Sequence, residues 1–385
     1  MYLLKYFNIL YREIVERKEQ RWELQRQQLV VHDPKRLEGI GNVRLSEEQK
    51  REIDDFYLAN WSSKIDYTSH LTYFAYSGRF DKAFLPEQLY IPEFVRYMNA
   101  NVRYNDVFND KNVIPYMAKG LGIHTPEVIY SCSNGFIIDS AQNKCEEDVM
   151  IESLAKEKDF FIKASVDSCG GSGCKFFTNN APGTAIAVQE IRDLIRSFGS
   201  DYSIQRCIKC HPCLKTLHPQ SANSIRVMTY RWHGDILTSP AVVRIGIGSM
   251  QVDNASAGGI FVGISDKGVM LPFAVNKYGK RYSEHPDTGI KFDGYRIEFI
   301  PKILAEAKRL HRSIPQIGVV NWDFTIGEDG EIILIEGNMR SGSIWLFQMA
   351  HGVNPFGDKA AEILQWTKKM KHLSLPQRAY HTFGN

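Results

Sequence analysis

Short strand-like runs dominate the sequence from residue 128 to residue 338 and restrict the folds open to the chain. Each run is rich in β-branched and aromatic residues and is bounded by turn residues, which is typical of β-strands. The expected strands are 128–131, 159–166, 175–179, 202–208, 224–232, 241–248, 259–265, 319–326 and 331–338. Two helix-like segments, 185–199 and 299–314, lie between them. This order of elements favours an α+β fold.

The chain outside these strands has mainly helical patterns. Residues up to about 100 are expected to form helices, and Ser46 is a plausible N-cap for one of them. A short helix that ends at Gly120 and Gly122 and a last helix over 355–371 complete the pattern. A chain of 385 residues has room for roughly two to three structural units.

Charge and cysteine content exclude some classes of protein. The chain has 47 Lys and Arg against 44 Asp and Glu, a net charge of +3, so we expect no nucleic-acid partner. Seven cysteines, an odd number, favour a reduced, cytoplasmic protein over a disulfide scaffold. Lys5, Arg12 and Glu13 interrupt the apolar start, which makes it a poor signal peptide. No segment reaches the roughly 18 apolar residues that a membrane span needs.

The first residues predict an amphipathic helix, because Leu3, Leu4, Phe7, Leu10 and Ile14 recur at helical spacing. One interpretation is a helix whose apolar side packs on the core. The other is a helix that lies on a membrane surface or on a partner enzyme such as a glycosyltransferase. A homodimer is also left open.

Three oxygen-bearing side chains occur in the last two expected strands. Glu336 and Asn338 in EIILIEGN are two residues apart, so they lie on the same face of a strand. Asp323 interrupts the apolar run VVNWDFTI, and the intervening GEDG predicts a hairpin that makes the two strands neighbours. Carboxylate and amide oxygens suit Mg²⁺, so these three residues are candidate metal ligands. The alternative is that they are solvated residues at strand ends.

A glycine-bearing loop joins the expected strands 159–166 and 175–179. Its residues Gly170, Gly171, Ser172 and Gly173 leave backbone N–H groups free to surround phosphate oxygens. Lys163 lies in the apolar strand before the loop, where a lysine is costly unless it meets an anion. The loop matches neither the P-loop nor the dinucleotide-binding pattern. An ordinary hairpin with a flexible tip is the alternative.

The segment CIKCHPC, residues 207–213, is rich in cysteine and has two metal-related interpretations. It matches the C-x-x-C-H pattern of haem attachment and, with Cys213, could bind zinc. Haem attachment requires export, and a second pair of ligands at zinc spacing is missing. We therefore expect small apolar residues in and after a strand.

The order of these features resembles the ATP-grasp superfamily. A DK pair precedes a helix that ends in GIHTP, a strand lysine precedes a glycine loop, a further strand ends in Gln205, and Asp323 and E-x-N follow. The chain looks most like the sugar-transfer-associated ATP-grasp group found with bacterial surface-polysaccharide genes. The segments that carry this closer similarity are QRCIKCHPCL, SANSIRVMTYR, VRIGIG with VDNASAGG, EHPDTG and IEGN. The similarity covers about residues 105–365.

The resemblance implies how ATP would bind. Lys111 and Lys163 would contact its phosphates, with Lys163 also near the adenine, and the glycine loop would close over the β- and γ-phosphates. Gln205 would lie near the adenine, and backbone groups of Cys207 and Ile208 would border the base.

The resemblance also assigns the remaining candidates. The three oxygen-bearing side chains would hold Mg²⁺. Arg226, Arg244 and Arg340 would neutralise the γ-phosphate or the carboxylate of the acceptor. Phosphoryl transfer depends mainly on positioning and charge neutralisation, so no general base need be conspicuous.

The implied activity is that of an ATP- and Mg²⁺-dependent carboxylate–amine ligase that forms an acylphosphate, with a sugar acid or an amino acid of surface-polysaccharide synthesis as substrate. A small-molecule kinase and a nucleotide-binding scaffold of a glycosyltransferase complex are the alternatives. The implied fold has a lid subdomain and a central antiparallel sheet. The expected divisions are a helical region 1–104, an ATP-grasp N-terminal subdomain 105–155, a lid 156–215, a catalytic subdomain 216–373 and a tail 374–385.

Overall fold

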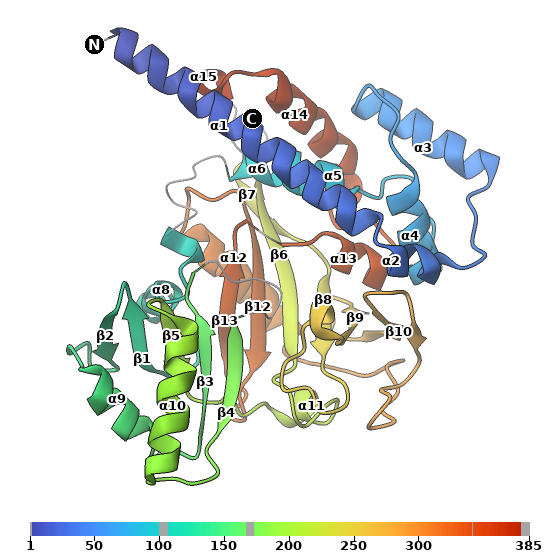
Figure 1. The fold of residues 1–385 in the computed structure, drawn as a ribbon. Coiled ribbons are helices and arrows are strands. Elements are labelled where there is room, and N and C mark those ends of the chain that lie inside the picture. Colours follow the sequence, from blue (N-terminus) through green and yellow to red (C-terminus); the bar gives the residue numbers. More distant parts are fainter. Residues whose placement is uncertain (1, 100–106, 167–172, 341, 379–385) are drawn as a thin grey trace.

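Two antiparallel sheets and a layer of helices make up the molecule (Figure 1). The computed structural model describes residues 2–99, 107–166, 173–340 and 342–378, with the backbone alone for 2–6. Within these ranges the expected strands are present, which confirms the α+β interpretation. Gly170, Gly171 and Ser172 of the glycine loop lie outside the described residues, whereas Gly173 is described and has a left-handed backbone, with φ of 75°.

The smaller sheet has five strands in the order β2-β1-β5-β3-β4, and all neighbours are antiparallel. Helices α9 and α10 cover one of its faces, because their apolar residues share a core with the inward side chains of β3 and β5. The bounds are β1 Val128–Ser133, β2 Phe136–Asp139, α9 Glu147–Leu154, β3 Asp159–Ala164, β4 Cys174–Thr178, α10 Ala185–Phe198 and β5 Tyr202–Gln205. The expected boundary at 155/156, between the N-terminal subdomain and the lid, separates β1 and β2 from the other three strands of this one sheet.

The larger sheet has eight strands in the order β11-β10-β9-β8-β6-β12-β13, with β7 beside β6. Helix α12 packs on one face and α13 on the other, and β12, between β6 and β13, is buried along its whole length. The strands are β6 Ser224–Trp232, β7 Asp235–Thr238, β8 Ala241–Ile245, β9 Ile260–Ile264, β10 Met270–Asn276, β11 Arg281–Tyr282, β12 Val319–Ile326 and β13 Ile332–Asn338. The helices are α12 Ile300–Arg312 and α13 Trp345–His351.

The helical region before residue 100 is joined to the larger sheet by a common core. Tyr73 and Phe94 share this core with Phe347 of α13 and with Trp366 of the helix α14 (Ala360–His372). Its elements are α1 Tyr2–Val31, α2 Pro34–Ile40, α3 Glu47–Asn60, α4 Thr68–Ser77, α5 Glu87–Leu89, a π-helical turn Tyr90–Val95 and α6 Arg96–Met98. The C-terminal helices α14 Ala360–His372 and α15 Leu375–Arg378 lie beside α1 (Figure 1).

Local signals placed two helices correctly. Ser46 caps α3 as predicted: its hydroxyl accepts from the Gln49 N–H at 3.1 Å, while the Gln49 side chain accepts from the Ser46 N–H at 2.9 Å. The short helix before Gly120 is α8, Ile114–Gly120.

The interpretation that the apolar side of the N-terminal helix packs on the core is wrong for the side chains that the structure describes. Phe7, Leu10 and Ile14 are 61%, 43% and 56% exposed, so they do not pack on the core. The face of α1 that meets the body carries Gln20 and the buried side chains of Gln27 and Val31. Among the described residues, no helix has the length and apolar character to cross a membrane.

Candidate functional site

A cavity of about 560 Å³ lies between the two sheets. Strands β3 and β4 form one wall, and β6, β8, β12 and β13 form the other. The end of α1 and the segments 206–210, 219–222 and 251–256 also contribute lining residues. The predicted site residues that line it are Lys111, Lys163, Gln205, Cys207, Ile208, Arg226, Arg244, Asp323, Glu336 and Asn338. Arg340 is exposed and is not among the lining residues, so the structure does not bring it to this cavity.

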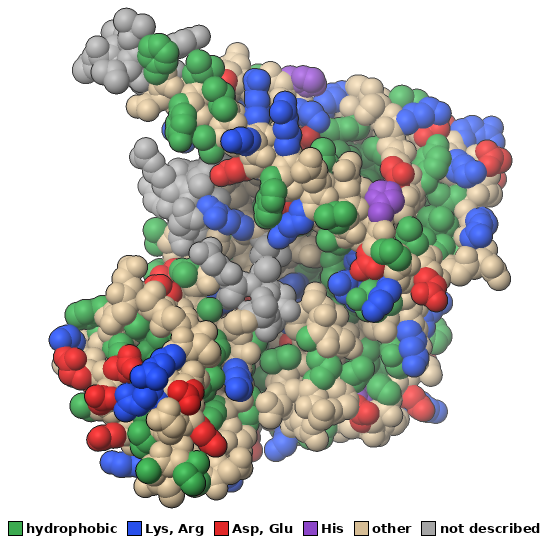
Figure 2. Space-filling view, viewed as in Figure 1, with side chains coloured by type: hydrophobic (Ala, Val, Ile, Leu, Met, Phe, Trp, Pro, Cys, Tyr) green, Lys and Arg blue, Asp and Glu red, His purple; other side chains and the backbone are tan. Residues whose placement is uncertain are grey.

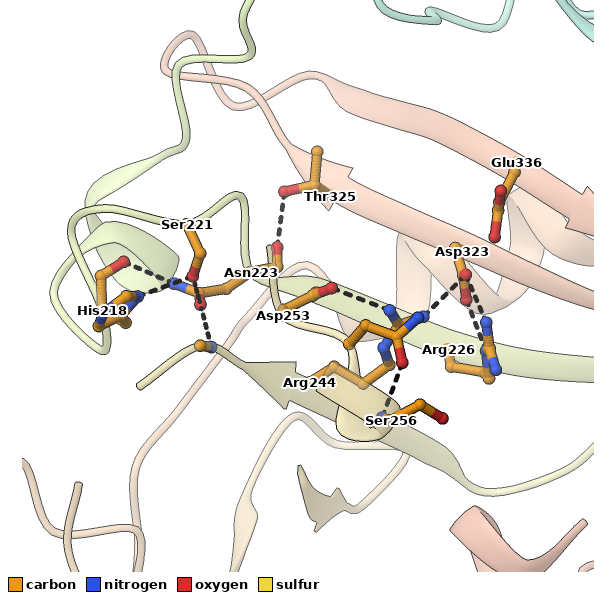
Figure 3. Close-up of polar contacts among 12 residues, drawn as sticks. His218, Ser221, Asn223, Arg226, Arg244, Asp253, Ser256, Asp323, Thr325 and Glu336 are labelled. Carbon is orange, nitrogen blue, oxygen red and sulfur yellow. Dashed lines mark hydrogen bonds and ion pairs between the residues drawn. The ribbon is translucent and has the colours of Figure 1, made fainter. Parts of the chain in front are cut away.

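A row of charged side chains crosses three neighbouring strands at the cavity wall. Asp323 of β12 lies opposite Arg226 of β6 on one side and Glu336 of β13 on the other. Opposed residues of antiparallel strands point to the same face, so the three side chains meet. Arg226 donates from Nε and Nη2 to the two Asp323 oxygens at 2.7 and 2.5 Å (Figure 3).

A β-bulge creates this row. From the hairpin, Phe324 pairs with Leu334, and an unbroken ladder would place Ile335 opposite Asp323. The register shifts by one residue at this point, so Glu336 takes that position. The carbonyl of the bulged residue Ile335 lies 3.4 Å from the amine of Lys163, which donates to it.

A second arginine extends the network. Arg244 of β8 donates to Asp323 Oδ2 at 2.8 Å and to Asp253 Oδ1 at 2.9 Å. Burial alone would raise the pKa of Asp323, but the guanidinium groups of Arg226 and Arg244 outweigh it and lower that pKa to about 2. Asp323 is therefore a carboxylate at neutral pH although it is 2% exposed.

Asp253 is a site residue that the sequence reasoning missed. It is buried, it lines the cavity, and burial raises its pKa against the opposing effect of Arg244. Its segment, VDNASAGG, contributed to the resemblance, but no role was predicted for it. The sequence offered one signal: Asp253 lies in the segment that connects the strand of Arg244 to the next strand.

Two lysines meet at the other wall. Lys163 is 5% exposed, and Lys111 donates from Nζ to the Ala164 carbonyl at 3.3 Å. Burial, opposed by Glu336 and assisted by the nearby Lys111, lowers the pKa of Lys163 to about 8. A buried amine next to a second cation favours an anionic ligand, which would restore its charge.

An apolar patch lies beside the lysines. Phe161 and Phe176 are directly opposite each other on β3 and β4 and line the cavity with Ile208 and Cys207. Burial, with Asp159 nearby, raises the pKa of the Cys207 thiol to about 12, so this cysteine is a poor nucleophile. The patch can accept a flat ring. Phe161 could have been predicted, because it is two residues before Lys163 and so shares its face.

The oxygen-bearing set fits a hard cation. Asn338 donates to Glu336 Oε1 at 3.1 Å, and Asp323 is opposite Glu336 across the ladder. Carboxylate and amide oxygens at one strand end are the ligands that Mg²⁺ prefers. Both Asp323 oxygens already accept hydrogen bonds from arginines, so the oxygens of Glu336 and Asn338 are more available as metal ligands.

Two cysteines of the 207–213 segment contact other side chains of the protein. Cys210 is buried, with its sulfur 3.6 Å from the Thr325 hydroxyl, and Cys213 contacts the His211 ring. Across the described ranges, no group of three or more His, Cys, Asp or Glu residues is arranged to hold a metal ion.

Two antiparallel sheets with a cationic, oxygen-lined cavity between them are the architecture of the ATP-grasp class. The chain belongs to the sugar-transfer associated ATP-grasp family, whose model matches residues 91–358. This match confirms the predicted family and fold. A comparison with functionally curated proteins finds no significant match.

Solved structures of ATP-grasp ligases resemble the chain only distantly. D-alanyl-alanine synthetase A from Vibrio cholerae is 15% identical, with a TM-score of 0.41 over 69% of this chain and 65% of that one. An ADP complex of N5-carboxyaminoimidazole ribonucleotide synthetase is 12% identical, with a TM-score of 0.37 over 62% of this chain and 46% of that one. The chain thus spans less than two thirds of either protein.

Proposed function

We propose that the protein is an ATP- and Mg²⁺-dependent carboxylate–amine ligase that forms an acylphosphate intermediate. The observation that carries this proposal is the meeting, in one cavity, of the Arg226–Asp323–Glu336 row and the pair Lys111 and Lys163. The row supplies oxygen ligands and guanidinium groups, and the pair supplies cations for phosphates. Family membership supports the ATP-grasp part of the proposal.

ATP would lie along the wall formed by β3 and β4. Its base would pack against Phe161, Phe176 and Ile208, near Gln205, which is buried beside Ser203. Its phosphates would extend toward the two lysines and Glu336. The loop 170–173, of which Gly173 alone is described, would close over the phosphates, as the resemblance implies.

The chemistry would proceed in two steps. A carboxylate oxygen of the acceptor attacks the γ-phosphorus, the bond to the β-bridging oxygen breaks, and ADP leaves. An amine nitrogen then attacks the acyl carbon, a C–N bond forms, and phosphate and a proton are released.

Residues of this chain would stabilise the charge that develops in both steps. Arg226 and Arg244 would orient the acceptor carboxylate and offset negative charge, and Lys163 would hold the transferred phosphoryl group. Mg²⁺ held by Asp323, Glu336 and Asn338 would supply neutralisation of the phosphate charges. Arg340 is exposed and is not a lining residue of the cavity, so the role proposed for it stays a prediction.

The family name supports a substrate related to sugar transfer. We infer a sugar acid or an amino acid destined for a surface polysaccharide, handled on the cytoplasmic side. A kinase that stops at phosphoryl transfer and a nucleotide-binding scaffold are the other candidates. The intact oxygen-bearing set disfavours the scaffold, because a protein that only binds nucleotide need not keep all three ligands.

We expect ADP release in a coupled assay to require a carboxylate acceptor. Sugar acids and amino acids are tested with hydroxylamine as the amine, because it converts an acylphosphate into a hydroxamate whatever the natural amine is. Carboxylate-dependent ADP release with hydroxamate formation supports the ligase. ADP release with an acceptor that has a hydroxyl group and no carboxylate would instead support the kinase, and ATP binding without turnover would support the scaffold.

ATP affinity is expected to fall as the pH rises above about 8. The Lys163 amine, whose pKa burial lowers to about 8, is protonated below that pH, and phosphate binding favours the protonated form. Binding above pH 8 must therefore take up a proton. Isothermal titration calorimetry from pH 7 to pH 9.5 measures the effect.

The variant Lys163→Met should bind ATP weakly and lose most of this pH dependence. Lys156→Met removes an exposed lysine and serves as the matched control. An unchanged pH profile in Lys163→Met would show that another group titrates.

A further inference from the structure

The outer face of helix α1 has a pattern that the cavity chemistry does not explain. Large apolar side chains lie along it, and the most exposed are Tyr11, Trp22 and Leu29, at 67%, 62% and 76%. At 100° per residue, these three lie within about 20° of one another around the helix, and Phe7 and Ile14 flank them. The helix therefore presents a stripe of aromatic and aliphatic groups away from the protein.

The acidic residues of the helix do not share this face. Glu13 accepts from the Leu375 N–H at 3.1 Å, and Glu16 pairs with Arg378. Glu19 lies 3.9 Å from Arg96, and Glu23 is half-buried against Arg26 and Gln27 of its own helix. Each carboxylate is directed toward the body or along the inner side of α1.

The charges on the outer face are basic. Arg17, Lys18 and Arg21 are exposed, and none forms an ion pair with any residue that the structure describes. They follow the apolar cluster of the first turns and flank Trp22. Hydrophobic and basic side chains predominate over α1 in Figure 2.

This combination fits an anionic lipid surface. Interfacial helices bury aromatic and aliphatic side chains at the level of the headgroups and add attraction between Lys or Arg and anionic lipids. Trp and Tyr are favoured at that depth because their rings are amphipathic. A second copy of the chain fits less well, because a two-fold pairing of this face would bring basic side chains together.

We propose that the outer face of α1 binds an anionic membrane surface as a peripheral anchor. The binding does not require ligase activity, so the two proposals can fail separately. The other side of the same helix reaches the cavity, where Arg26, Gln27 and Val30 are lining residues. Docking through α1 would therefore hold the cavity at a set position relative to the bilayer.

Vesicle co-sedimentation of the full chain tests the proposal. Binding is expected on vesicles of phosphatidylglycerol and phosphatidylcholine, and at least tenfold weaker binding on phosphatidylcholine alone or at high salt. The triple variant Arg17→Glu, Lys18→Glu, Arg21→Glu and the double variant Phe7→Glu, Ile14→Glu should each lose at least tenfold in binding. Ile186→Glu, which changes an apolar residue that is 64% exposed on α10, should bind as the parent does.

ATP binding by each variant shows that it is folded, since the substituted residues do not line the cavity. Equal vesicle binding by the parent and both α1 variants would overturn the proposal. So would a parent that ignores anionic vesicles and instead forms a dimer that the α1 variants abolish, because the face would then be a protein interface.

Discussion

Glu336→Ala is expected to abolish turnover and leave the fold intact. The substitution removes a carboxylate at the point where Asn338, Asp323 and Lys163 meet. Loss of a group that stabilises transition-state charge typically costs about 10²- to 10³-fold in rate, and a lost metal ligand should reach or exceed the upper end. The fold should survive because Glu336 is half-buried and accepts one hydrogen bond from a neighbour on its own strand.

Steady-state ADP release and a urea denaturation curve measure the two effects separately. Glu331→Ala is the matched control, since Glu331 lies next to the same strand but pairs at the surface with Lys302 and His124. Activity retained in Glu336→Ala would contradict the metal assignment. A large loss of stability in this variant would show that the residue holds the sheet together and would leave its chemical role unsupported.

Asp323→Ala is expected to destabilise the protein as well as inactivate it. Asp323 is 2% exposed and accepts from Arg226 and from Arg244. Among the described residues, its removal leaves Arg226 without an ion pair and Arg244 with Asp253 as its ion-pair partner. Breaking a buried pair in this way typically costs about 3–5 kcal/mol, because the remaining charge stays desolvated.

The shift of the urea midpoint measures this loss. Asp148→Ala removes an aspartate that pairs with Arg192 at 2.7 Å, but the Asp148 side chain is 74% exposed, so a change below about 1 kcal/mol is expected. A small effect in Asp323→Ala, comparable with the control, would mean that solvent reaches the arginines. In that case Asp323, like Glu336, would be needed for turnover but not for the stability of the fold.

Much of the site could be predicted from spacing in the sequence. Glu336 and Asn338, like Phe161 and Lys163, are two residues apart, so each pair shares a strand face wherever the strand lies. The buried lysine and the hairpin between the last two strands were predicted on similar grounds and are confirmed. Strands β2, β7, β10 and β11 were not predicted. Three of them are runs of two to four residues, which carry little periodicity, and β10 contains Pro272, which weakens a strand signal.

The sequence by itself determined most of the strands along the chain, the helix cap at Ser46 and the side-chain types of the cavity. These depend on neighbours within a few residues, where alternation and hydrogen bonding act locally. The tertiary structure alone decided that a bulge at Ile335 places Glu336 opposite Asp323, that Asp253 joins the arginines, and that one side of α1 lines the cavity while Phe7 and Ile14 stay exposed. Each of these depends on how distant segments pack, and a one-residue change in register or a rotation of a helix leaves the local pattern unchanged.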